Sequence, residues 1–225
     1  MPVSLFTFHS LTLTVSNFVK SYHTDAGPPV LTVPSLAFAP GFHYFRGGNG
    51  SGKTTFLRCV AGLLPFSGTI VLDNAYEINR DPVAYRMRVN YAEAEPLYPD
   101  FLTPRDLASF VGRAKLSPVG QTDELIDVLG MRDFWTKPTG QFSSGMLKKT
   151  SLLLALLGTP RLVLLDEPLT TLDVETAQRL FIHVRQLREQ HDVSFWLTSH
   201  QDVSLTGLPL TGIWQVGHGG IVPVT

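Results

Sequence analysis

The 225-residue sequence predicts an α/β fold with a parallel β-sheet and a helical insertion. Three observations predict it. Residues 1–80 are rich in threonine, valine and phenylalanine and contain turn signals, which is typical of strands. Residues from about 100 to 158 have a helical pattern. Two short apolar runs with a helical pattern between them then follow, as expected of parallel strands that are buried on both faces.

Composition narrows the class of protein. A net charge of −1 gives no bulk attraction to nucleic acid, and we expect no nucleic-acid partner. The longest leucine-rich run, Leu152–Leu157, is far shorter than the roughly 20 residues of a spanning helix. The single cysteine, Cys59, suits a reducing compartment, and the N-terminus lacks a basic region, so we expect a cytoplasmic protein. A mean hydropathy of +0.11 favours a surface covered by a partner.

The first elements in chain order surround a glycine-rich loop. Leu11–Val15 alternates apolar and polar residues and predicts a half-buried strand. Phe42–Phe45 predicts a short buried strand, and Phe56–Leu64 predicts a helix. The loop between them matches G-x-x-x-x-G-K-[ST], in which backbone N–H groups surround phosphates and a lysine neutralises them. This phosphate loop consists of Gly47, Gly48, Asn49, Gly50, Ser51, Gly52, Lys53, Thr54 and Thr55.

Helices dominate the next part of the chain. Thr103 and Pro104 are typical of a helix N-cap followed by its first turn. Asp123–Leu129 predicts a short helix that ends at Gly130, and Ser144–Leu157 predicts a longer one. A buried strand, Leu162–Leu165, a helix, Val174–Gln190, and another buried strand, Val193–Leu197, complete the pattern.

Two carboxylates follow the strand Leu162–Leu165. Ligands gather at the carboxyl ends of parallel strands, so Asp166 and Glu167 are expected to face the phosphates. Asp166 and the Thr54 hydroxyl suit a Mg²⁺ ion, and Glu167 suits a base that polarises the attacking water. Acidic residues also often cap strands and begin turns, which is the alternative interpretation. His200, after the last strand, could bond a γ-phosphate oxygen or be a surface residue.

Taken together, the motifs resemble those of an ABC-type ATPase. The resemblance extends from Leu11 to Val222 and implies a single domain, residues 1–225. It implies a P-loop NTPase core with a parallel sheet and an N-terminal antiparallel β subdomain, at about 1–90 and 159–225. The inserted α-helical subdomain is at about 91–158. The resemblance rests on the phosphate loop and on four later segments, Phe142–Met146, Leu162–Pro168, Thr170–Asp173 and Thr198–His200.

The resemblance also implies roles for site residues. Two copies are expected to hold two ATP molecules with Mg²⁺ between them, head to tail. Lys53, Glu167 and His200 are the expected catalytic residues, with His200 as the γ-phosphate sensor. Ser143 and Gly145 are expected to touch the ATP of the opposite copy through the positive end of their helix. Asp173 is expected in the loop that links the two sites.

An aromatic residue is expected to stack on the adenine. Tyr22 lies 53 − 22 = 31 positions before Lys53, about where the family places that residue. Such stacking contributes about 1–3 kcal/mol. One alternative is that Tyr22 only packs at the end of a strand. Another is that Phe18 stacks on the adenine in its place.

Some positions depart from the family pattern. The family has a glutamine between the core and the helical lobe, and Ala94 occupies that position between Glu93 and Glu95. An alanine cannot ligate anything, so this role is lost or moved to one of the two glutamates. Ser144 and Met146 replace a glycine and a glutamine of the signature segment Phe142–Met146, and Met146 resembles exporters with a separate membrane subunit. The Lys148–Lys149 pair predicts a solvated helix face or a partner contact.

These features predict a subunit that hydrolyses ATP for a membrane transporter. We expect this transporter to be an exporter, because Met146 resembles the exporters with a separate membrane subunit. We expect a separate transmembrane permease subunit and a position on the inner face of the cell membrane. One alternative is a soluble ABC ATPase acting on nucleic acid or ribosomes, which usually carries coiled coils or two cassettes. Another is a degenerate regulatory nucleotide-binding module, which the missing glutamine favours and the intact Lys53 and Glu167 oppose.

Overall fold

A six-stranded, mainly parallel sheet forms the centre of the molecule. The computed structural model describes residues 13–22, 28–199, 207–217 and 219–224. The sheet has the order β10-β9-β3-β8-β7-β6, and only the pair β10–β9 is antiparallel. Its strands are β3 (Phe42–Arg46), β6 (Val89–Ala92), β7 (Leu162–Leu165), β8 (Ser194–Thr198), β9 (Leu210–Gly217) and β10 (Gly220–Pro223).

A second, four-stranded sheet is antiparallel throughout and has the order β2-β1-β4-β5. Its strands are β1 (Leu13–Lys20), β2 (Leu31–Phe38), β4 (Ser67–Leu72) and β5 (Tyr76–Glu77). One face of β1 is buried, as the sequence pattern predicts for a half-buried strand, and the alternation is interrupted once, where the pairing with β4 shifts register between Ser16 and Val19. The two sheets confirm the predicted α/β class with an antiparallel region beside a parallel one. Residues 11 and 12 of the predicted first strand lie outside the described residues.

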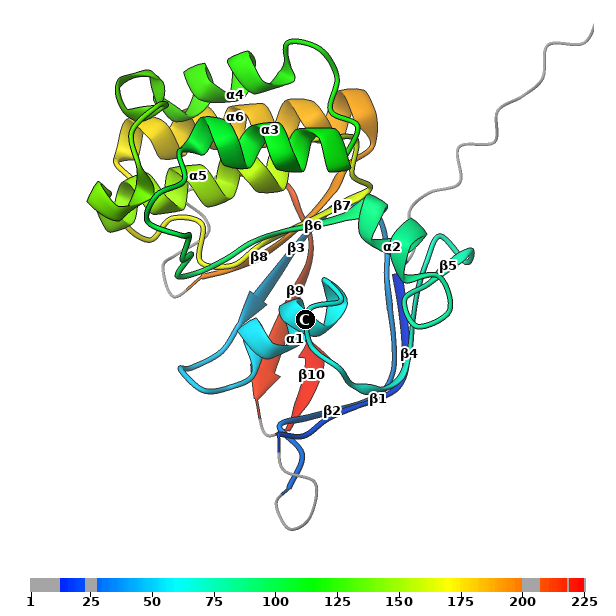
Figure 1. Cartoon of the computed structure of the whole chain (residues 1–225). Coiled ribbons are helices and arrows are strands. Elements are labelled where there is room, and N and C mark those ends of the chain that lie inside the picture. Colours follow the sequence, from blue (N-terminus) through cyan, green and yellow to red (C-terminus); the bar gives the residue numbers. More distant parts are fainter. Residues whose placement is uncertain (1–12, 23–27, 200–206, 218, 225) are drawn as a thin grey trace, which may run out of the picture.

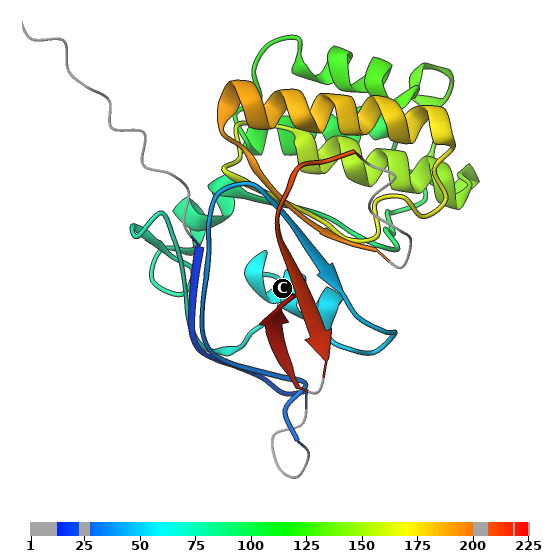
Figure 2. The same cartoon turned by 180° about the vertical axis from the view of Figure 1, so that it is seen from behind.

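The helices form two groups (Figure 1). Four of them, α3 to α6, cover one side of the six-stranded sheet, and Figure 2 shows the same layer from behind. Helix α1 lies on the other side, between the two sheets. The helices are α1 (Lys53–Val60), α2 (Pro82–Arg88), α3 (Pro104–Ala114), α4 (Gln121–Leu129), α5 (Ser144–Leu156) and α6 (Val174–His191), with 3-10 turns at Arg132–Phe134 and Thr139–Gln141.

Strand β7 separates two hydrophobic cores. Leu162 and Leu164 belong to the core shared with α1 and the antiparallel sheet, whereas Val163 and Leu165 belong to the core beneath α3–α6. All four side chains are fully buried. Trp196 fills the first core, where its ring centroid lies 4.3 Å from that of Phe38. Burial on both faces explains why this part of the sequence is continuously apolar.

The structure changes the predicted bounds of the helix after the phosphate loop. The helix after the phosphate loop begins at Lys53 and ends at Val60, where the sequence pattern predicts Phe56–Leu64. It ends early because Gly62 adopts a positive φ of 73°. Cys59 is buried in this helix, and burial raises the pKa of its thiol to about 11. In the part of the chain that the structure describes, every helix is too short or too polar to cross a membrane.

Candidate functional site

The phosphate loop leads directly into helix α1. Gly52 is the N-cap residue and has a φ of 102°, which glycine adopts without strain. Because glycine has no capping side chain, no side-chain oxygen caps the helix, and the first helical bond runs from Phe56 N–H to Gly52 O at 2.8 Å. The preceding N–H groups at a helix start have no partner within the helix, and the helix dipole adds positive potential there. The end of α1 is therefore suited to bind phosphate.

Lys53 is held beneath this loop. Its side chain is buried, and Nζ donates to Gly47 O at 2.7 Å and to Gly48 O at 3.1 Å. Burial lowers the pKa of the ammonium, while the charges of Glu167 and Asp166 oppose that shift. The loop thus fixes a cation next to the free N–H groups of α1.

A cavity of about 690 Å³ opens at this loop and brings predicted residues from distant segments together. It combines the phosphate loop with an aromatic ring, a carboxylate from the end of β7 and the chain segment after β6. Its size and the mixture of N–H groups, a lysine and hydroxyls suit a nucleoside triphosphate. The lining residues are Tyr22, Val30, Asn49, Gly50, Ser51, Gly52, Lys53, Thr54, Thr55, Ala94, Glu95, Glu167 and Thr170.

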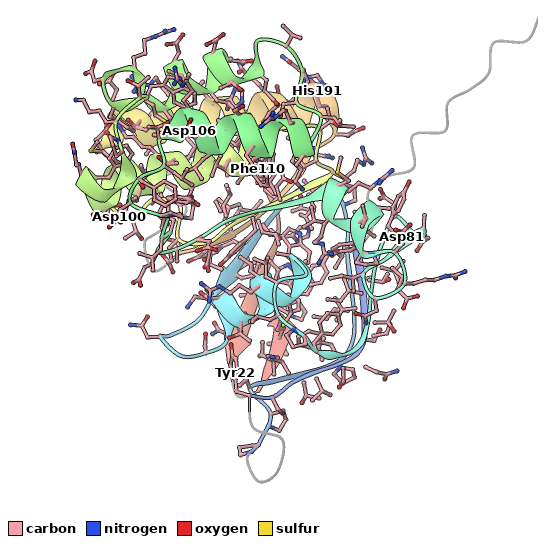
Figure 3. The ribbon with its side chains drawn as sticks, viewed as in Figure 1. Tyr22, Asp81, Asp100, Asp106, Phe110 and His191 are labelled. Atoms are coloured by element: carbon pink, nitrogen blue, oxygen red, sulfur yellow. The ribbon has the colours of Figure 1, made fainter. Side chains whose placement is uncertain are left out.

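Tyr22 lines this cavity and is 58% exposed as a residue, and its hydroxyl lies 3.0 Å from Thr55 Oγ1. Lys20 Nζ is 4.8 Å from the ring centroid. Figure 3 shows Tyr22 well apart from Phe110 of α3. Phe18 is fully buried in the core and therefore has no ring face to offer to a base. The exposed ring of Tyr22 makes it the better candidate for stacking.

Asp166 is fixed by two neighbouring strands. Its carboxylate accepts a hydrogen bond from Thr198 Oγ1 on β8 at 2.6 Å and another from the Tyr91 hydroxyl on β6 at 2.9 Å. Arg58 Nε, from α1, donates in turn to the Tyr91 hydroxyl at 3.4 Å. Asp166 itself is 1% exposed. The motifs did not assign roles to Tyr91 or Arg58, because their contacts depend on which strands are neighbours.

Glu167 follows Asp166 in an unusual backbone conformation. Its φ of 49° lies in the left-handed region, which costs energy for a residue other than glycine. Its N–H donates to Thr198 Oγ1 at 2.9 Å, and Thr170 N–H donates to its carbonyl at 3.2 Å. This tight turn directs Glu167 into the cavity that Lys53 also lines.

The oxygen donors near the phosphate loop fit a magnesium ion. Thr54, which carries a hydroxyl, lines the cavity. Asp166 is buried and is not among the lining residues, but its two carboxylate oxygens have lone pairs beyond the two hydrogen bonds they accept. Hydroxyl and carboxylate oxygens are ligands that Mg²⁺ prefers.

The signature segment lies elsewhere. Ser143 is exposed and caps α5 by accepting a bond from Met146 N–H at 3.3 Å. A Cβ atom on Gly145 would come 2.7 Å from Thr171 O, so a side chain there requires the backbone to move. Asp173 caps α6 by accepting bonds from Thr176 and also pairs with Lys149 at 3.0 Å. Among the described residues, Ser143, Gly145 and Asp173 do not line the cavity.

Lys148 corrects an expectation. The prediction of a solvated lysine pair or a partner contact is wrong for this residue, which is 1% exposed. Its Nζ donates to the carbonyls of Glu93, Ala94 and Asp166, at 2.8, 2.6 and 3.2 Å. Ala94 and Glu95 line the cavity, whereas the Glu93 carbonyl is turned to the lysine. His200, the expected phosphate sensor, lies outside the described residues.

Comparison with known proteins decides the family. A family model described as ABC transporter matches residues 35–170. The chain belongs to the ABC transporter family. The matched region includes the phosphate loop, the signature segment and both carboxylates. Together with the geometry, the match identifies an ATP-binding domain of the ABC transporter family.

Individual ABC proteins are similar over different lengths. The chain is 32% identical over 157 residues to the ABC transporter ATP-binding protein NatA of Bacillus subtilis, an alignment of 66% of this chain and 63% of that protein. It is 27% identical over 203 residues to the spermidine/putrescine import ATP-binding protein PotA of Pseudomonas fluorescens, covering 87% of this chain and 56% of the relative. The chain therefore spans less than two thirds of the length of these relatives.

The fold is similar to that of a solved ATP-binding subunit of an ABC transporter. The TM-score is 0.81 at 21% identity, and the match covers 95% of this chain and 89% of the other. This likeness confirms the predicted fold.

Proposed function

We propose that this chain binds ATP with Mg²⁺ and hydrolyses it to drive a membrane transporter. The observation that carries the proposal is the shared cavity, which Lys53, Thr54 and Glu167 line together. The N–H groups at the start of α1 and the Lys53 ammonium bind the phosphates and neutralise their charge. Tyr22 stacks on the adenine. Catalysis then comes mainly from position and charge.

Each carboxylate has one role in this proposal. Glu167 accepts a proton from the water that attacks the γ-phosphate, and the turn around it holds its carboxylate in the cavity. Asp166 and Thr54 hold the Mg²⁺ ion, which when bound neutralises phosphate charge. Tyr91 and Thr198 keep the Asp166 carboxylate in one orientation. His200 completes the site as the γ-phosphate sensor.

A second copy completes the site from the outside. Ser143 and Gly145 lie apart from the cavity of their own chain, and Ser143 is exposed at the start of α5. A head-to-tail dimer brings this helix start to the ATP of the partner, where its N–H groups meet the γ-phosphate. Asp173 then lies in the segment between the two sites. We assign residues 91–158 to a helical lobe that moves against the rest of the domain during closure.

An apolar surface on the helical side suits a membrane subunit. Leu97, Phe101 and Phe110 are 88%, 78% and 69% exposed. Large apolar side chains at such exposure favour a protein contact. A separate permease covering these residues places the chain at the inner face of the cell membrane. Purification from membranes in mild detergent should recover this permease with the wild-type chain.

Two observations bear on the direction of transport. Met146 at the end of the signature segment resembles exporters with a separate membrane subunit, and we therefore propose export. The similarity to PotA, an import protein, favours the opposite direction. ATP-dependent cargo uptake into inside-out membrane vesicles indicates export, and its absence there with uptake into right-side-out vesicles indicates import.

The base assignment has a direct test. Glu167→Gln should retain ATP binding, abolish hydrolysis and accumulate as an ATP-bound dimer in size-exclusion chromatography. Glu189→Gln makes the same chemical change on the exposed side of α6 and should hydrolyse ATP like the wild type. Full hydrolysis by Glu167→Gln would contradict the assignment of the base.

A further inference from the structure

Lys148 joins three segments that are distant in the sequence. It lies in the second turn of α5, the helix that Ser143 caps. Its ammonium has three N–H donors, and the three carbonyls of Glu93, Ala94 and Asp166 accept from it. With 1% exposure, the side chain is enclosed by protein.

One of its acceptors, Ala94, lines the nucleotide cavity, and the other two are adjacent in the chain to residues that line it. Ala94 lines the cavity with Glu95, and Asp166 immediately precedes Glu167, which also lines it. Any shift of these backbone segments therefore changes the position of the Lys148 ammonium. The other end of the side chain is attached to α5, and the buried residues of α5 belong to the hydrophobic core beneath α3–α6. The Lys148 side chain thus connects the cavity wall at Ala94 to the helix that carries Ser143 and Gly145.

The ammonium of Lys148 is surrounded by carbonyl and carboxylate groups. Burial lowers the pKa of Lys148 to about 8, while the carboxylates of Asp166, Glu167, Glu95 and Glu93 oppose that shift and favour the charged form. A buried ammonium without partners is costly, so the three carbonyl bonds are needed to hold it in the protein. Charged hydrogen bonds are stronger than neutral ones, which makes the link stiff.

We propose that Lys148 is a positioning residue that couples the nucleotide cavity to the signature helix α5, through the main chain at Ala94 and Asp166. This coupling rests on the proposed function of the site as an ATPase. The side chain of Ala94 has no polar atom. The link therefore uses the backbone carbonyl of this residue, which accepts a hydrogen bond from Lys148 on α5. The hydrogen bond from Lys148 connects Ala94, where the glutamine of the family is absent, to helix α5.

A second lysine provides a matched control. Lys115, which follows α3, donates from Nζ to the carbonyls of Arg86 and Val89. Burial lowers its pKa to about 8 as well. Both lysines thus tie the helical side to β6, Lys115 at the beginning of the strand and Lys148 beyond its end. Only Lys148 contacts residues at the cavity, so stability and coupling are separable.

The experiment compares Lys148→Met with Lys115→Met in the full chain. Thermal unfolding measures stability, and amide hydrogen exchange of residues 144–156, with and without ATP and Mg²⁺, measures coupling. ATP hydrolysis is measured as kcat and KM. Lys148→Arg keeps the charge and several donors and serves as the conservative variant. Lys53→Ala tests ATP binding by the proposed site independently.

Both methionine variants should lower the melting temperature. Only Lys148→Met should lose the ATP-dependent change in exchange of α5, with kcat lower by about tenfold or more and KM within about threefold. Lys148→Arg should restore most of the exchange response. If Lys148→Met does not fold, Lys148→Gln, which removes the charge and keeps a polar side chain, replaces it in the comparison with Lys115→Met. In that comparison a smaller exchange response than in Lys115→Met supports the coupling, and an equal one overturns it.

Three results would overturn the coupling. They are an α5 exchange response that is absent in the wild type, one that Lys148→Met retains, or equal losses in Lys115→Met. Failure of the proposed function is a different result, in which the wild type binds ATP and does not hydrolyse it, or Lys53→Ala binds it as well as the wild type. The exchange response depends only on binding, so it still decides the coupling.

Discussion

Removal of one hydroxyl tests how Asp166 is oriented. In Tyr91→Phe the carboxylate loses the donor 2.9 Å from Oδ2 and keeps the bond from Thr198. Burial, and then the charge of Asp166, raise the pKa of Tyr91, so its hydroxyl stays protonated and donates across the working range of pH. The variant therefore removes this charged hydrogen bond together with the longer bond of 3.4 Å from Arg58 Nε, and it leaves the aromatic ring in place.

The magnitude follows from the kind of bond. A hydrogen bond to a charged group contributes about 1.5–3 kcal/mol, so a loss of ~2 kcal/mol should lower the melting temperature by about 4–8 °C. Residues that orient a metal ligand typically change metal affinity by about 10–100-fold. We expect the Mg²⁺ concentration for half-maximal hydrolysis to rise by about tenfold, while ATP binding without metal is unchanged.

Tyr85→Phe is the matched control. The Tyr85 hydroxyl is fully buried and donates to Val60 O at 2.8 Å, away from the cavity. This neutral bond contributes about 1 kcal/mol, so Tyr85→Phe should lower the melting temperature without changing the Mg²⁺ dependence. Mg²⁺ titrations of hydrolysis and calorimetric unfolding measure both quantities. Equal Mg²⁺ dependence in Tyr91→Phe and the wild type would refute the orienting role.

Two further changes test the signature region and the α6 cap. Gly145→Ala places a Cβ 2.7 Å from Thr171 O and should lower the free energy of unfolding by about 1–3 kcal/mol. In the control Gly112→Ala the new Cβ meets its nearest atom at 3.5 Å, so this variant should not be destabilised. Equal effects of the two changes on thermal unfolding would contradict the close contact at Gly145. The N–H and hydroxyl of Thr176 lower the pKa of Asp173, so this stabilisation is present above its unfolded value of about 3.9 and is lost as the pH falls through the lowered folded value. Asp173→Asn keeps a cap without a titrating group, so its stability relative to the wild type should improve as the medium becomes acidic, and a constant difference in acid unfolding excludes this contribution.

The phosphate loop was predictable because its chemistry is local. Gly52, Lys53 and Thr54 are adjacent in the chain, and the spacing alone implies a strand, a turn and a helix start. The strand Leu162–Leu165 and the carboxylates after it follow the same logic, since apolar strands precede a ligand edge. These parts of the site were predictable because their residues lie close together in the sequence.

The support around the carboxylates was not predictable in this way. Tyr91 reaches Asp166 because β6 pairs with β7, and Thr198 does so because β8 pairs with β7 on the other side. The order of strands in a sheet is not contained in a local pattern. Lys148 shows the same limit, because a lysine beside a second lysine is typical of a solvated face. Its burial depends on carbonyls that lie more than fifty residues earlier.

Cys59 has a practical consequence for the study of this chain. It is the only cysteine, it is buried, and its pKa of about 11 leaves almost no thiolate at neutral pH. Because the thiolate is the reactive form, thiol-directed dyes and cross-linkers should leave it unmodified. A cysteine introduced at an exposed position can then carry a single fluorophore or spin label in an otherwise native background. The chain is therefore ready for distance measurements between labelled copies without prior mutation of its own thiol.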